Sequence, residues 1–364
     1  MPTTTQLLIP DVNTAAQMMV KAYSDADFEQ VKNIENSLHS KELSEKISGT
    51  SDEFHNAAVA LTRAGMFYQA YNLILTGLER APKNTDLLSD ALKYGMHCHV
   101  DPTALDGLCG HLNRINKRFW SWRAYQFCFD YLMERLPYCE TDEELNKKES
   151  EIRNLIAEFK AHIDYLADYS DSEKAYMMDY EFHMSKGDAK GATAALLEAI
   201  NHDKLKNKCA QCALKMADYC FEHGDYSEVI PYAERAVSIK EDQQSINLGY
   251  TYYILAMSRE WANRGDIELG KAKGVLKQIY QEFFSAYLYL EAGRDNLMES
   301  IKKQVKILEF KTGQPSGIPF EDLDEEKNAV GLNMIRTLFE QAKRTNNNKE
   351  QRNPLASMID FDND

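Results

Sequence analysis

The sequence predicts an all-α fold, and three observations support that prediction. Glycine and proline are scarce, with 17 and 9 in 364 residues, so few positions interrupt a helix. Leu, Ala, Glu, Lys and Met, which favour helix, are abundant. Apolar residues recur three and four positions apart, as they do along one face of a helix. We expect helices over nearly the whole chain.

Residues 1–50 are predicted to form N-terminal helices, and a helix pair follows them. Its first helix carries Phe54, Ala58 and Leu61 and stops at Gly65, where a tight turn needs a positive φ. The second runs from about Phe67 and ends at Pro82, which cannot continue a helix. The apolar stripe of this second helix comprises Ala70, Ile74, Gly77 and Leu78.

Further helices are predicted along the centre of the chain. Asp101 and Pro102 have the residue types of an N-cap and a first helical position. Thr141 caps the longest helix, whose acidic first turn suits the helix dipole. Ser170 and Glu173 form a capping box that begins the next helix. The expected helices are 85–100, 119–136 and 141–169. Residues 119–136 are so aromatic that they should form central core.

Glycine turns recur in the second half of the chain, at Gly187, Gly224, Gly265 and Gly293. Around Gly224, small residues stand at the spacing seen around Gly65, with Ala217 before the turn and Ala236 after it; Tyr226 and Val229 lie between. Ser258 and Ala286 occupy the corresponding small place before the last two turns, and Ala192 and Ala199 follow Gly187.

The pattern resembles the tetratricopeptide repeat, a two-helix unit of about 34 residues. Phe54, Ala58, Gly65, Phe67, Ala70, Gly77 and Pro82 fit its spacing of large and small residues, while Leu61 replaces the usual tyrosine. The small residues let the two helices of a unit approach closely. The resemblance implies a right-handed superhelix of antiparallel helix pairs over residues 51–310. A compact all-helical bundle is the alternative.

Glycine and proline cluster in residues 311–326 and mark the clearest break. Residues 311–344 are interpreted as a linker and a C-terminal capping helix, which a solenoid needs at its open end. Residues 345–364 are predicted to be a mobile acidic tail.

Composition disfavours several functional classes. The net charge of −15, with 57 acids against 42 bases, opposes a nucleic-acid partner. No apolar run approaches the length of a membrane span, and the first residues lack a secretory signal. Seven scattered cysteines are typical of reduced thiols, so we expect a cytoplasmic protein without a membrane partner. Its oligomeric state cannot be inferred.

No catalytic motif or cofactor site is evident, and we expect no enzyme. Cys209 and Cys212 form a C-x-x-C, but it is interpreted as small apolar positions inside a helix rather than as a metal or redox site. The group His97, Cys98, His99, Cys109 and His111 is the candidate for zinc, but His97 and His99 would face different sides of a helix.

The resemblance also implies a binding face. Tetratricopeptide proteins bind peptides or helices along the concave face formed by the first helix of each unit. That face would include His55, Asn56, Val59 and Arg63, with Lys215 and Asp218 from the later unit. Asn56 occupies one place of the family's carboxylate clamp, whereas Asp52, His55 and Val59 depart from it. Trp122 and Arg123 are added because their residue types dominate binding hot spots.

The sequence therefore predicts a non-enzymatic scaffold or adaptor that binds a partner protein or peptide without a cofactor. Two alternatives stay open. One is a peptide-sensing regulatory subunit that controls a partner enzyme, and the other is a metal-binding protein that uses the cluster from His97 to His111.

Overall fold

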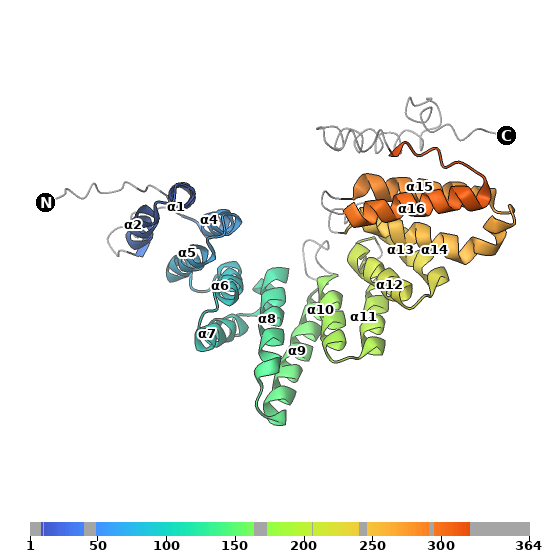
Figure 1. Cartoon of the computed structure of the whole chain (residues 1–364). Coiled ribbons are helices and arrows are strands. Elements are labelled where there is room, and N and C mark those ends of the chain that lie inside the picture. Colours follow the sequence, from blue (N-terminus) through green and yellow to red (C-terminus); the bar gives the residue numbers. More distant parts are fainter. Residues whose placement is uncertain are drawn as a thin grey trace. The chain divides into compact units, whose positions relative to one another are not determined.

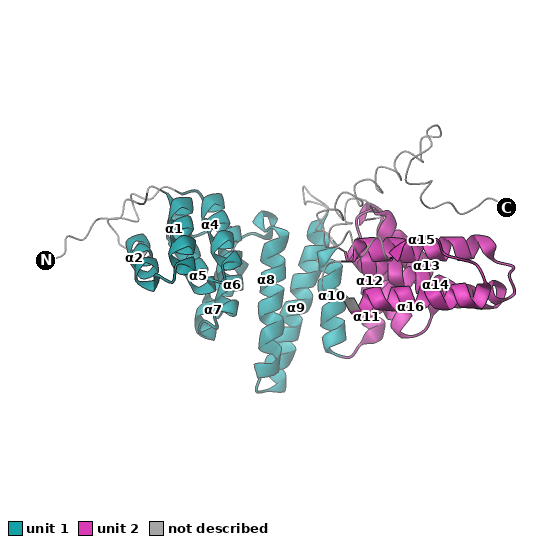
Figure 2. Ribbon diagram, turned by 45° about the horizontal axis from the view of Figure 1, so that its top comes forward, with its two compact units in different colours: residues 1–186 teal, residues 187–364 magenta. Residues whose placement is uncertain are grey.

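The computed structural model describes Ile9 and residues 11–39, 49–163, 173–205, 207–239, 246–290 and 295–320 (Figure 1). Every regular element in these ranges is a helix, which confirms the all-α class. Their contacts group the chain into two compact units, residues 1–186 and residues 187–364 (Figure 2). The boundaries predicted at 50, 310 and 344 stay predictions.

The first unit consists of two rows of helices. Row A follows the chain through α1, α4, α6, α8 and α10, and each helix contacts the next in the row. Row B comprises α2, α5, α7 and α9, and each packs on its row A neighbour. The bounds of row A are Val12–Ser24, Ser51–Arg63, Thr85–His97, Trp122–Arg135 and Lys174–Ser185; those of row B are Phe28–His39, Phe67–Arg80, Pro102–Asn113 and Asp142–His162.

The second unit repeats this arrangement. Helices α12, α14 and α16 contact one another in sequence, and α11, α13 and α15 pack against them. Their bounds, in chain order from α11, are Ala189–Asn201, Ala210–Glu222, Tyr226–Ser238, Leu248–Glu268, Lys273–Tyr289 and Asp295–Thr312. Pairing between consecutive helices and contact between alternate ones is the tetratricopeptide-like arrangement that the sequence predicted. The handedness of a superhelix stays a prediction.

The small residues lie where the helices approach one another. Ala58, Ala70, Ala217 and Ala236 are all fully buried, as close packing requires. Gly77 is needed for the same reason, because a Cβ atom there would lie 2.9 Å from Cγ of Phe54. The turns after α4 and α12 use Gly65 at φ +80° and Gly224 at φ +78°, which confirms their predicted role.

Capping explains several helix starts. Thr50 and Glu53 form a capping box at α4, in which each side chain bonds the other's backbone N–H. Asp101 caps α7 with Pro102 at its first turn, and Thr141 caps α9, both as predicted. The aromatic helix α8 begins at Trp122 rather than Phe119, whose side chain is exposed. Core rings of this segment are Trp120, Tyr125, Phe127, Phe129 and Tyr131.

The turn predicted at Gly265 is wrong. Helix α14 continues through this glycine to Glu268, and Gly270 at φ +70° makes the turn instead. The N–H of Lys271 donates to the carbonyl of Asp266 at 2.8 Å, which closes the helix end. The longer helix buries Ile267 in the core formed with α15 and α16. The burial of Ile267 explains why the helix ends at Gly270 and not at Gly265.

Several predicted features lie outside the described residues. They are the capping helix up to residue 344, the acidic tail 345–364, the turn at Gly293, Ser170 of the predicted capping box, and the continuation of α9 towards Tyr169.

Candidate binding face on row A of the first unit

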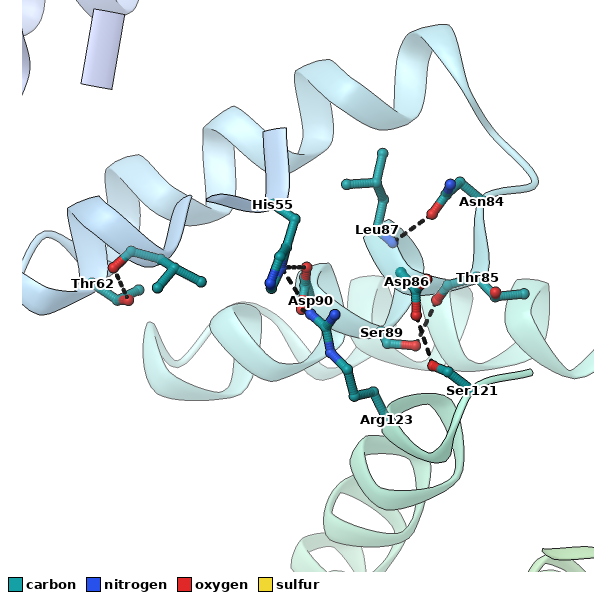
Figure 3. A network of polar contacts seen from close by, with 11 residues as sticks. His55, Thr62, Asn84, Thr85, Asp86, Leu87, Ser89, Asp90, Ser121 and Arg123 are labelled. Carbon is teal, nitrogen blue, oxygen red and sulfur yellow. Dashed lines mark hydrogen bonds and ion pairs between the residues drawn. The ribbon is translucent and has the colours of Figure 1, made fainter. Parts of the chain in front are cut away.

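One buried carboxylate connects three helices of row A (Figure 3). Asp90 of α6 is 1% exposed. Its Oδ2 lies 2.7 Å from Nδ1 of His55 on α4, and its Oδ1 accepts a hydrogen bond from Nη2 of Arg123 on α8. The same guanidinium nitrogen lies 2.8 Å from Nδ1 of His55. Asp90 is therefore surrounded by basic groups from both neighbouring helices.

This arrangement satisfies a group that would otherwise be costly to bury. A carboxylate out of water needs a cation and hydrogen-bond donors. Arg123 supplies the cation, and its side chain remains 20% exposed, while that of His55 is 29% exposed. The network thus has a buried acidic centre, Asp90, and a basic rim, formed by His55 and Arg123, that reaches solvent. The sequence named both rim residues but missed Asp90, whose only signal is a charge within the apolar run of α6.

Hydrogen bonds at the start of α6 hold the same region. Ser121, which precedes α8, donates to Oδ1 of Asp86 at 2.7 Å, and Thr85 donates to the carbonyl of Phe119 at 3.0 Å. Asn84 accepts from the N–H of Leu87 as the N-cap of α6. The N-terminal ends of α6 and α8 are therefore joined by hydrogen bonds beside the Asp90 network.

Tyr94 lies one turn beyond Asp90 on α6 and is buried. Burial raises the pKa of Tyr94 to about 12, with a further contribution from the charge of Asp90. Thr62 of α4 acts in the opposite direction and lowers this pKa. Tyr94 therefore stays protonated at neutral pH.

Aromatic rings and lysines extend the basic rim. Nζ of Lys93 on α6 lies 5.0 Å from the ring centroid of Phe127 on α8. Nζ of Lys174 on α10 lies 3.0 Å from the ring of Trp122, which is half-buried. Both are cation–π contacts between row A helices. The sequence analysis did not single out either lysine, because the ring that each contacts across the row lies on another helix.

The predicted residues of α4 occupy neighbouring positions. His55, Val59 and Arg63 are spaced four apart and share one face; Val59 is half-buried and Arg63 exposed. Asn56 is exposed and lies one position around the helix from His55. The fold thus brings His55 and Arg123 into direct contact, with Val59 and Arg63 extending from them along α4.

Lys215 and Asp218 belong to α12 of the second unit. Lys215 is exposed, whereas Asp218 is half-buried, and its charge raises the pKa of Tyr250 on α14. Oδ1 of Asp218 is buried and has no hydrogen-bond partner within the described part of the chain. Burial raises the pKa of Asp218. This carboxylate is under-compensated in the isolated chain.

The Asp218→Asn variant is expected to gain stability relative to the parent as pH rises. Because the folded-state pKa of Asp218 is raised, its favourable contribution is present at low pH and is lost as pH rises through that pKa. Asparagine does not titrate. Urea unfolding should show that the free energy of unfolding of the variant, relative to that of the parent, increases by under about 1 kcal/mol from pH 4 to pH 7. The same variant-to-parent difference at both pH values would contradict a raised pKa of Asp218.

The histidines and cysteines considered for zinc are not brought together. His97 packs on Phe67, with ring centroids 5.2 Å apart, and His99 occupies a turn at φ +52°. Cys109 contacts Cys128 instead. Across the described ranges, no three His, Cys, Asp or Glu side chains are grouped as a metal ion would need. Cys209 is the N-cap of α12 rather than an interior position, contrary to the prediction, although it and Cys212 are fully buried.

Comparison with solved structures gives several matches, one of which is described here. No protein-family model matches the sequence, and no curated protein matches it. A solved structure, the TPR2AB-domain:pHSP90-complex of yeast Sti1, aligns with 83% of this chain and 98% of its own chain, at 15% identity and a TM-score of 0.26. Among the described residues, no helix is both long and apolar enough to cross a membrane.

Proposed function

We propose that this protein is a non-enzymatic interaction scaffold that binds a partner protein or peptide along row A of its first unit. The observation that supports this most is the Asp90 network, which fixes His55 and Arg123 at the surface of three successive helices. Groups held before binding lose less conformational entropy when a partner arrives.

The residue types on this face suit macromolecular recognition. Arg and Trp are the side chains most often found at binding hot spots, and here Arg123 and Trp122 are adjacent and half-buried. Within the described residues only Nη2 of Arg123 is engaged, so Nε and Nη1 can donate to an acceptor on a partner. Val59 and Arg63 would extend the contact along α4, and Asn56 would border it.

A photo-crosslinking experiment tests this proposal. A photoreactive phenylalanine is introduced at Arg63 on row A, and in a separate protein at Tyr68, which is on row B and 57% exposed. Irradiation in cells that express the protein should yield a discrete adduct from position 63 and little from position 68. Mass spectrometry would identify the adduct's partner.

The matched variant carries Arg123→Ala together with the photoreactive residue at position 63. We expect the adduct to decrease severalfold, because the hot-spot donor is lost while the reporter is unchanged. Equal adducts from positions 63 and 68, or an adduct unaffected by Arg123→Ala, would refute binding at this face. Circular dichroism of each variant establishes that it has folded.

A further inference from the structure

Two thiols from different helices lie close together in the first unit. Sγ of Cys109 on α7 and Sγ of Cys128 on α8 are 3.8 Å apart, although 19 residues separate them in the sequence. A disulfide requires about 2.05 Å, so the two sulfurs need to approach by only about 1.8 Å. Such a shift is within the reach of side-chain rotation and a small helix adjustment.

The surroundings of Cys109 favour its thiolate. Asn113 donates from Nδ2 to Sγ of Cys109 at 3.6 Å, and Lys117 donates from Nζ to Oδ1 of Asn113 at 2.8 Å. The hydrogen bond from the Cys128 thiol is the main cause of a lowered pKa at Cys109, and the charges of Lys148 and Lys117 add to it. The pKa of Cys128 is raised, largely by the same hydrogen bond and by burial.

Access also differs between the two sulfurs. Cys109 is 6% exposed, while Cys128 is fully buried. A low-pKa thiol beside a second cysteine that resolves its oxidised form is the usual arrangement of a redox-sensitive pair. At Cys98 and Cys220, by contrast, burial raises the pKa.

We propose that Cys109 and Cys128 are an oxidisable pair that forms an intramolecular disulfide when the folded protein meets hydrogen peroxide. The Cys109 thiolate attacks the peroxide oxygen, the O–O bond breaks, and Cys109 sulfenic acid and hydroxide form. The Cys128 sulfur then attacks the sulfenic sulfur; the S–S bond forms, the S–O bond breaks, and the hydroxyl leaves as water with the thiol proton. With hydrogen peroxide, the sum is two thiols and one peroxide giving one disulfide and two waters.

The bond would join a row B helix to a row A helix. Cys128 lies five positions after Arg123 on α8, so oxidation would fix the helix that carries part of the candidate binding face. The inference does not depend on the proposed function, because it concerns the chemistry of the two sulfurs alone.

Peptide mapping of the full chain tests the pair. The protein is treated with hydrogen peroxide under native conditions, denatured, alkylated at its remaining thiols and digested without reduction. We expect a peptide that links Cys109 to Cys128, absent from the Cys109→Ser and Cys128→Ser variants and retained in Cys139→Ser. Recovery of both cysteines as alkylated thiols, while Cys139 is oxidised, would overturn the proposal.

A kinetic comparison separates activation from simple proximity. Asn113 is exposed, so Asn113→Ala should fold normally and yet slow disulfide formation by at least about threefold, since Cys109 loses a donor to its thiolate. Lys117→Met should slow it in the same direction. A linked peptide that forms only in urea concentrations that unfold the chain would show that the native pair does not react, and would refute the proposal.

Discussion

The Arg123→Met variant is expected to lose about 2–3 kcal/mol of unfolding free energy from the first unit. Methionine keeps much of the side-chain volume but removes the cation from Asp90, which is 1% exposed and cannot regain water. His55 remains on the other carboxylate oxygen, and Arg123 itself is partly exposed, so the loss should be smaller than that for a fully buried ion pair.

Two further variants distinguish a buried charge from general damage. Arg63→Met removes an exposed arginine from α4 and should change stability by no more than about 0.5 kcal/mol. The double variant Asp90→Leu with Arg123→Met removes both charges and should recover at least half of the loss. Trp120 and Trp122 report on the first unit by fluorescence once Trp261 is replaced by Phe. Equal losses for Arg63→Met and Arg123→Met would contradict this account.

The Gly249→Ala variant is expected to destabilise the second unit by about 2–3 kcal/mol. A Cβ atom at this first-turn position of α14 would lie 2.7 Å from the backbone nitrogen of Leu290 and 2.8 Å from the carbonyl carbon of Tyr289. Because these are backbone atoms at the end of α15, no side-chain rotation can relieve the overlap. Hydrogen exchange measured by mass spectrometry should show faster exchange in α14 and α15.

Gly265 is the matched control on the same helix. It lies inside α14, and nothing approaches within 4 Å of a Cβ atom built there. Gly265→Ala should therefore stabilise the second unit by about 0.5–1 kcal/mol, as alanine does in a helix interior. If Gly265 instead made a turn with positive φ, alanine would destabilise it. Opposite signs at positions 249 and 265 are the expected result.

Much of the fold could be predicted because its determinants are local. Gly65 and Gly224 mark turns through backbone conformation, and the Asp101–Pro102 pair marks a helix start through capping; both effects act within a few residues. Gly265 was misinterpreted because Gly270 can also end the helix, and the choice depends on the burial of Ile267 against other helices. Sequence spacing carries no information about that burial.

The candidate site was only half predictable for the same reason. His55 and Arg123 were named from the family resemblance and from residue type, but Asp90, which joins them, lies 35 and 33 residues away. Cys109 was grouped with nearby histidines, whereas its sulfur meets Cys128 on another helix. In both cases the partner is set by helix packing rather than by spacing along the chain.

Among the described helices, the main contacts join elements that are next or next but one along the chain. Loops of modest length therefore suffice to form most of the packing, which favours rapid folding. A nascent chain can assemble its first helix pairs on the ribosome before the last ones are synthesised, and a lesion in one pair weakens chiefly its immediate neighbours.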